Sequence, residues 1–236
     1  MCETLVKIST GCSCINDNIG GGISPESISL IYGEAETGKT TLAIQCAIDC
    51  ALQKLKIFFV DCDNTFSTKR LSQLSGNKFD QIAEKINLIK PKDFKEQMAV
   101  VDRIQDYTVR NFGLIIFDTF TSLYGAKVAE VSGKAFSVNR ELNRQLAILA
   151  QTAKIRKIPI IITSQVRAVF DEQNDTVAPV ATRVLKFWAD TIIAMKPSNY
   201  PQTIKVTLEQ TRENPHQTTC YVQIGETGIS DSEFHE

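Results

Sequence analysis

The pattern of hydrophobic positions predicts strands and helices in alternation over the first two thirds of the chain. Continuous apolar runs, typical of strands buried on both faces, occupy 27–33, 56–61, 86–90, 113–119 and 158–165. Segments with helical spacing of apolar residues lie at 39–54, 93–111 and 135–154. Because helices on both faces of a parallel sheet bury both sides of every strand, we expect an α/β fold with a mostly parallel sheet.

The last third has a different pattern. The segments "DTIIAMK", "TIKVTLEQT" and "TTCYVQIG" follow one another with only turns between them, and Pro201 and Pro215 lie in two of those turns. Short turns can join antiparallel strands but not parallel ones, so we expect an antiparallel extension of the same sheet. We expect one domain over 1–236, with an N-terminal segment (1–26) that leads into the core and an acidic tail (227–236) that frays.

Composition and charge narrow the classes of function. The chain has 236 residues, of which 43% are hydrophobic and 22% charged, and its net charge is -1. This is a globular composition, and any nucleic-acid surface has to be a local basic patch. No apolar run is long enough to cross a membrane, and the N-terminus has no signal-peptide pattern, so we expect a cytoplasmic protein without a membrane partner.

The spacing of the seven cysteines argues against both a disulfide framework and a metal site. Cys12 and Cys14 form one close pair, but no second pair or histidine cluster completes a tetrahedral set. Cys46 and Cys50 lie one turn apart on a predicted helix. We interpret these cysteines as small core residues.

The stretch "GEAETGKTT" matches the phosphate-loop pattern G-x-x-x-x-G-K-[S/T] and lies between a predicted strand and a predicted helix. In this context the backbone N–H groups converge on phosphates at a helix N-terminus. Lys39 reaches the β- and γ-phosphates, and the Thr40 hydroxyl binds Mg²⁺. The sequence therefore predicts a site for ATP and Mg²⁺, made by Gly33, Glu34, Ala35, Glu36, Thr37, Gly38, Lys39, Thr40 and Thr41.

Acidic residues follow two other predicted strands. Asp118 ends the run "GLIIFD" and is suited to hold the magnesium ion through water. Asp61 and Asp63 follow "KIFFV", where a neighbouring strand can present an acid to the water that faces the γ-phosphate. Either acid can turn inward, and the alternative is that Asp63 only caps the next segment.

These motifs resemble those of the RecA/RadA recombinase superfamily, most of all the archaeal RadB family of short RadA paralogues. The likeness extends over nearly the whole chain. It begins at the ATPase core, so we expect no counterpart of the N-terminal DNA-binding domain of RadA or of its polymerisation linker. The stretches that carry it are "TGCSCINDNIGGGISPESISLIYGEAETGKTTLAIQ", "FFVDCDNTFSTKRL", "LIIFDT", "IPIIITSQV", "KVTLEQTREN" and "CYVQIGETGI".

The resemblance implies roles for single residues. Asp63 stands where the family has its catalytic glutamate, and Asp118 matches the Mg²⁺ acid. Gln165 matches the glutamine that senses the γ-phosphate, and Arg70 an arginine that can stack on the adenine. Arg212 matches the second basic residue of a K-x-R finger that reaches the nucleotide of a neighbouring subunit.

Two departures from the family pattern predict slow turnover. Asp63 is one methylene shorter than glutamate, and misplacing such a group by about 1 Å can cost roughly 100-fold in rate. Position 210 has glutamine where the family's finger has lysine, which removes one cation from the transition state. We therefore expect nucleotide binding with weak, DNA-linked ATPase activity.

The segment "VRAVFDEQNDTVAPVATRVLKF" occupies the place of the family's second DNA-binding loop. Its candidate contacts are Arg167, Arg183 and Lys186, which neighbouring acids offset. Phe187 and Trp188 can stack on bases or pack in the core, and we favour the core for Trp188. We expect weak binding to single-stranded DNA.

The preferred hypothesis is an ATP-binding RecA-like paralogue for DNA repair and homologous recombination. It would mediate or regulate the main RadA-type recombinase or other recombination proteins, and it could form a homo-oligomer. One alternative is an ATP-switched adaptor without significant hydrolysis. Another is a RecA-core ATPase of the circadian-clock or helicase type.

Overall fold

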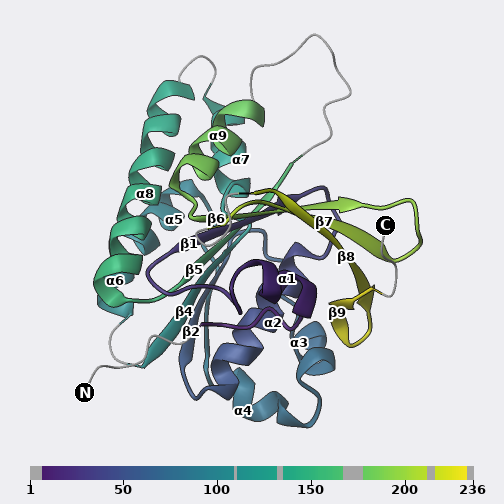
Figure 1. Ribbon diagram of the computed structural model, residues 1–236. Coiled ribbons are helices and arrows are strands. Elements are labelled where there is room, and N and C mark those ends of the chain that lie inside the picture. The colour runs from purple at the N-terminus through teal and green to yellow at the C-terminus, as the bar shows by residue number, and fades with distance from the viewer. Residues whose placement is uncertain (1–6, 109–110, 132–134, 167–177, 212–215, 233–236) are drawn as a thin grey trace.

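The strands form one mixed sheet with helices on both faces (Figure 1). The computed structural model describes residues 7–108, 111–131, 135–166, 178–211 and 216–232. In this part of the chain the sheet has nine strands in the order β3-β2-β4-β5-β1-β6-β7-β8-β9. The order places the strand that precedes the phosphate loop, β1, near the middle of the sheet.

Six neighbouring strands, from β3 to β6, run parallel, as the hydrophobic pattern predicted. In sheet order they are β3 (Ile86–Ile89), β2 (Lys56–Asp61), β4 (Phe112–Asp118), β5 (Ile160–Gln165), β1 (Ile28–Gly33) and β6 (Thr191–Pro197). The central four are almost completely buried along their length. A parallel strand buried on both faces needs apolar side chains at successive positions, which is why these strands were visible in the sequence.

The antiparallel extension is also confirmed. It consists of β7 (Thr203–Gln210), β8 (Thr218–Gly225) and β9 (Gly228–Asp231), each antiparallel to the strand before it. The prediction that 227–236 frays is wrong for its first half, because Gly228–Asp231 pairs with β8 and Ile229 is buried. Residues 233–236 lie outside the described residues.

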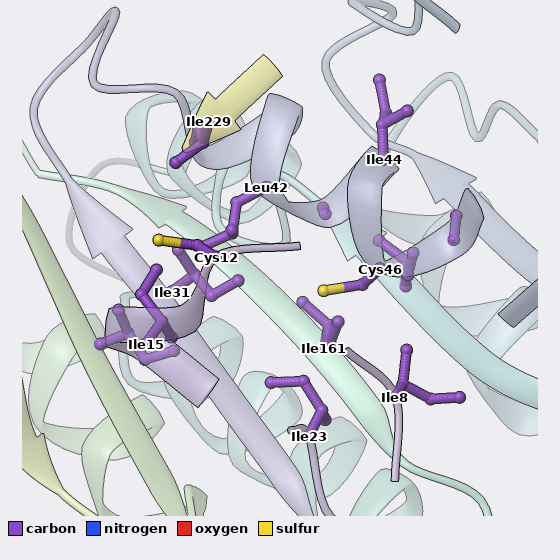
Figure 2. Close-up of a cluster of buried hydrophobic side chains, with 14 of the residues drawn as sticks. Ile8, Cys12, Ile15, Ile23, Ile31, Leu42, Ile44, Cys46, Ile161 and Ile229 are labelled. Carbon is purple, nitrogen blue, oxygen red and sulfur yellow. The ribbon is translucent and has the colours of Figure 1, made fainter. Parts of the chain in front are cut away.

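Two layers of helices cover the sheet (Figure 1). One layer packs against a core cluster that contains Ile31, Ile116 and Ile161, and Figure 2 shows part of this cluster. The other packs against a cluster that contains Leu30, Phe117 and Ile162. Adjacent strand residues thus enter opposite cores. The first layer consists of α1 (Ser13–Asn18), α2 (Lys39–Leu52), α3 (Thr68–Ser75), the short 3₁₀ turn η1 (Gly76–Lys78) and α4 (Phe79–Ala83), and the second of α5 (Phe94–Asp102), α6 (Ile104–Tyr107), α7 (Ser122–Glu130), α8 (Ala135–Arg156) and α9 (Ala178–Trp188).

Two segments differ from the sequence-based expectation. The helix expected over 93–111 is divided at Arg103, whose φ of -103° and ψ of 7° leave the helical conformation. The second half of the expected DNA-binding loop forms α9.

Trp188 packs against the second core cluster, as expected, and its indole N–H donates to Asn143 Oδ1 at 2.9 Å. Phe187, by contrast, is 78% exposed.

Candidate nucleotide-binding site

Several of the predicted site residues lie at the carboxyl edge of the parallel strands. The register places Gly33 beside Gln165 on the β1–β5 pair and Asp61 beside Asp118 on the β2–β4 pair. Parallel strands bring their carboxyl ends to one edge, and ligands of open α/β sheets bind outside that edge. The fold therefore gathers residues that lie far apart in the sequence.

Two glycines of the phosphate loop are required by close approaches of other elements. A Cβ on Gly33 would lie 2.0 Å from the carbonyl oxygen of Met195 on β6. Gly38 has a φ of 88°, and a Cβ there would lie 2.8 Å from Ile224 Cδ1. The loop thus turns tightly between β1 and α2, and Gly38 is the N-cap of α2. A helix that begins in this way directs its first N–H groups at an anion.

Lys39 carries a buried positive charge at the start of α2. Its side chain is only 8% exposed, and burial lowers the pKa of its ammonium group, although Asp118, Asp63 and Glu34 oppose the effect. Among the described residues its hydrogen-bond partners are neutral oxygens, the Glu34 carbonyl and the Thr37 hydroxyl at 3.4 Å. A buried cation without a carboxylate in contact fits an anionic ligand such as a phosphate.

Asp118 lies across from the first turn of α2. Its Oδ2 accepts a hydrogen bond from the Thr40 hydroxyl at 2.8 Å, and its Oδ1 accepts one from Thr163 on β5. The side chain is buried, and burial raises the pKa of its carboxyl group, against the effect of these two hydrogen bonds. A hydroxyl and a carboxylate held together beside the phosphate loop are the oxygen donors that Mg²⁺ prefers.

The two acids after β2 have different environments. Asp61 is buried, and its carboxylate accepts the backbone N–H groups of Thr65 at 2.9 Å and Phe66 at 3.1 Å. Lys90 Nζ lies 3.3 Å from the same carboxylate. Asp63 is exposed and makes no hydrogen bond among the described residues, yet its charge acts on both Lys39 and Asp118. Asp61 therefore stabilises the segment that follows β2, whereas no backbone N–H group of the described residues occupies the carboxylate of Asp63.

The β8–β9 hairpin forms a further side of the site that the sequence analysis missed. Gln45 of α2 exchanges two hydrogen bonds with the backbone of Ile229, at 2.9 and 2.7 Å. The guanidinium of Arg70 donates to the carbonyl oxygens of Gly225 and Glu226, at 2.9 Å each. In the structure Arg70 thus fastens this hairpin, and its stacking on an adenine stays a prediction.

Gln165 and Arg212 are the remaining predicted site residues, and of these two only Gln165 lies in the described part of the chain. Gln165 ends β5 with an exposed side chain, and the N–H of Val166 donates to the carbonyl of Gly33 at 3.0 Å. Gln165 therefore borders the start of the phosphate loop. Gln210, at the finger position, donates to the carbonyl of Ala189 at 3.2 Å. Arg212 lies outside the described residues.

The predicted DNA contacts Arg183 and Lys186 differ in whether their positive charge is already paired with an acid among the residues that the structure describes. Arg183 is exposed on α9, whereas Arg167 lies outside the described residues. Lys186 is held by an ion pair with Glu209 Oε2 at 2.6 Å, and it also donates to the hydroxyl of Tyr32 at 2.9 Å. Its ammonium lies 4.5 Å from the centre of the Tyr32 ring. Lys186 has a structural partner that the sequence did not reveal.

Comparison with known proteins defines the class to which this fold and site belong. The family model Rad51 matches residues 2–232. The chain therefore belongs to the Rad51 family, which agrees with the resemblance drawn from its motifs and with the architecture of the sheet.

Within this family the chain is similar to proteins named DNA repair and recombination protein RadB. It is 32% identical over 227 residues to the RadB of Thermococcus onnurineus, covering 95% of this chain and 97% of that protein. The RadB of Thermococcus kodakarensis is also 32% identical, over 96% of this chain and all of that protein. A crystal structure of the RadB recombinase superposes with a TM-score of 0.82 at 31% identity, covering 96% of this chain and 100% of that one.

No helix in the described part of the chain is long and apolar enough to cross a membrane.

Proposed function

We propose that this chain binds ATP with Mg²⁺ at the carboxyl edge of its sheet and acts in DNA repair and homologous recombination. The observation that supports this most directly is the buried Lys39 ammonium, which contacts neutral oxygens in a loop that begins a helix. The relatives named above are DNA repair and recombination proteins of nearly the same length.

The proposal assigns a task to the phosphate loop and to the residues around it. The N–H groups at the start of α2 and the Lys39 ammonium bind the β- and γ-phosphates, since both present positive charge at one point. Thr40 and Asp118 would hold Mg²⁺, which neutralises phosphate charge when it is bound. Arg70 would lie along the nucleotide base, on the side of the site closed by the β8–β9 hairpin.

Turnover is expected to be weak. Asp63 would orient the attacking water, and it would do so with a shorter side chain than glutamate and from an exposed position. Gln165, beside the start of the phosphate loop, would sense the γ-phosphate. Arg212 would reach the nucleotide of a neighbouring subunit in a homo-oligomer, without the help of a lysine at position 210.

DNA binding in this proposal is weak as well. Arg183 is the exposed cation on α9, and Arg167 would add a second charge. Lys186 would contribute less, because a phosphate would have to displace Glu209 from it. A protein with slow hydrolysis and a small basic surface suits the role of a mediator or regulator of the main RadA-type recombinase.

One alternative has support from the structure. Asp61 accepts hydrogen bonds from backbone N–H groups and Asp63 is exposed, so the proposed phosphate site would lie beside a weak catalytic acid. Such a protein can act as an adaptor whose shape follows its nucleotide state, without significant hydrolysis.

The decisive experiment measures equilibrium binding of ATP and its hydrolysis on one preparation, with and without Mg²⁺ and single-stranded DNA. We expect Mg²⁺-dependent binding and slow hydrolysis that DNA raises. Binding without turnover, unchanged by DNA, would favour the adaptor. A chain that fails to bind ATP in the presence of Mg²⁺ would refute the proposal as a whole.

A further inference from the structure

A cluster of thiols and one carboxylate joins the two ends of the described chain, away from the phosphate loop. Cys12 and Cys14 lie at the start of α1 with their Sγ atoms 3.6 Å apart. Cys12 Sγ donates to Oδ1 of Asp231, the last residue of β9, at 2.8 Å. One potential ligand atom from each of these three residues lies within 4.8 Å of the other two. Cys220 on β8 raises the pKa of the Cys14 thiol but is not one of these three residues.

The spacing of these atoms matches a tetrahedral metal centre. Zn²⁺ binds thiolate sulfur at about 2.3 Å, which places two sulfur ligands of a tetrahedron about 3.8 Å apart. The observed Cys12–Cys14 separation of 3.6 Å is close to that edge. Cys12 is the N-cap of α1 and has an extended backbone with a φ of -129° and a ψ of 121°, whereas Cys14 lies in the first turn of the helix. This change of conformation accompanies the approach of the two sulfurs.

The carboxylate is already oriented by the backbone. Asp231 Oδ1 accepts the N–H of Cys14 at 2.8 Å, and Oδ2 accepts the N–H of Ser13 at 3.1 Å. Metal-binding carboxylates are held by such additional hydrogen bonds, which fix their direction. Capping of α1 accounts for these two bonds, but it does not require the thiols of Cys12 and Cys14 at the same place.

A divalent cation bound here would replace the thiol protons of Cys12 and Cys14 and would balance the charge of the Asp231 carboxylate.

We propose that Cys12, Cys14 and Asp231 bind one thiophilic divalent cation of the Zn²⁺ class. Thiolates select Zn²⁺ over Mg²⁺, which prefers oxygen ligands, so this site and the phosphate-loop site would take different metals. The bound ion would connect the N-terminal segment to the β8–β9 hairpin. Figure 2 shows Cys12 in the buried cluster that also contains Leu42 of α2 and Ile229 of β9.

The test is a titration of the reduced, metal-free full chain with Co²⁺ in the absence of nucleotide. Thiolate ligands give a sulfur-to-cobalt charge-transfer band, and a tetrahedral site gives intense visible bands. The phosphate-loop site offers only oxygen ligands and gives no such band, so failure here is distinguishable from failure of ATP binding. We expect one Co²⁺ per chain, displaced by Zn²⁺, and tighter binding as the pH rises, because binding releases thiol protons.

Variants assign the signal to these residues. Cys14→Ser removes a half-buried ligand and should weaken Co²⁺ binding about 100-fold, and Asp231→Asn should weaken it about 10-fold. Cys50→Ala changes a buried cysteine of α2 outside the cluster and should leave the bands unchanged. Circular dichroism establishes that each variant is folded.

Three results would overturn the proposal. The first is a reduced wild-type chain without a charge-transfer band, and the second is an unchanged band in folded Cys14→Ser. The third is a wild-type chain that binds no Co²⁺ when reduced but joins Cys12 to Cys14 on air oxidation, which would make the pair a redox couple.

Discussion

The candidate site has one half that would bind the nucleotide and one half that would hydrolyse it, and the two halves differ in how deeply their side chains are buried. The half that would bind phosphate and magnesium is buried and fixed: Lys39 and Asp118 are almost inaccessible, and Asp118 is held by two hydroxyl groups. The half that would carry out hydrolysis is exposed, with Asp63 and Gln165 both at the surface. In the proposed function the core of one chain would provide binding, whereas turnover would depend on exposed groups.

This difference has a physical reason. Groups that bind phosphate gain strength from low dielectric and from rigid placement, so they are best located at buried strand ends. A catalytic acid has to reach water, and a finger residue has to reach a neighbouring subunit, so both belong at the surface. Shortening an exposed acid by one methylene therefore affects the rate without disturbing the binding half.

The largest expected effect is on the binding half. Lys39→Ala removes the buried ammonium group and should weaken ATP binding about 100-fold, because charge-assisted hydrogen bonds to phosphate are each worth about 1.5–3 kcal/mol. The measurement is isothermal titration with ATP and Mg²⁺. Lys154→Ala, an exposed lysine on α8, is the matched control and should bind as the wild type does. Equal affinity in the two variants would remove Lys39 from the site.

The next effect is on the turnover half. Asp63→Glu restores the missing methylene and should raise the hydrolysis rate roughly 10- to 100-fold, with little change in ATP affinity. Single-turnover hydrolysis separates this rate from binding. Asp63→Ala serves as the reference without an acid, and it should fall below the wild-type rate. If Asp63→Glu is no faster than the wild type, the shorter acid is already well placed or another group orients the water.

Asp118→Asn should weaken Mg²⁺-dependent ATP binding without lowering the stability of the nucleotide-free protein. The Mg²⁺-dependent part of ATP affinity should fall about 10-fold, because Asn replaces a charged ligand partner of the metal. The nucleotide-free protein should be at least as stable as the wild type at neutral pH, because the variant no longer buries a carboxylate. The measurement is thermal unfolding without nucleotide, with the exposed Asp80→Asn on α4 as control.

The contribution of Asp118 to the stability of the folded protein should change with pH in a defined direction. Burial raises the pKa of Asp118 above 3.8 in the folded protein, so the folded state holds this proton more firmly than the unfolded chain does. The contribution of Asp118 to stability therefore decreases as the pH rises from 3.8 through the raised pKa, and its cost persists above that range. Asp118→Asn should remove this dependence. A variant less stable than the wild type at neutral pH would show that the hydrogen bonds from Thr40 and Thr163 outweigh the cost of burial.

The sequence predicted the parts of the molecule that have a local signature. The parallel strands appear as continuous apolar runs, and the phosphate loop has fixed positions, so both were recognisable. The roles of Asp61 and Asp63 could not be separated, because only the fold shows which carboxylate the backbone N–H groups of Thr65 and Phe66 occupy. The meeting of Cys12 with Asp231 was invisible for the same reason, since sheet pairing alone brings the ends of the chain together.

The short strand β9 illustrates the limit of local patterns. It has only four residues and ends in an acidic residue, and these two features predict fraying. It is held instead by contacts with distant residues, through β8 and through the two hydrogen bonds from Gln45 to Ile229. Tertiary contacts of this kind override local propensity and cannot be inferred from a single segment.

The smallest expected effect concerns Arg70, which would influence ATP binding through its contacts with the β8–β9 hairpin. Arg70→Ala removes two hydrogen bonds to the carbonyls of Gly225 and Glu226, and partly exposed bonds of this kind contribute about 1 kcal/mol in total. We expect faster amide exchange in Gly225–Gly228 and about 3-fold weaker ATP binding, because Ile224 of this hairpin packs over Gly38. Lys69→Ala changes the exposed neighbour on α3 and should alter neither quantity. Weaker ATP binding with unchanged exchange would mean that Arg70 contacts the nucleotide directly, as the family resemblance predicts, and does not act through the hairpin.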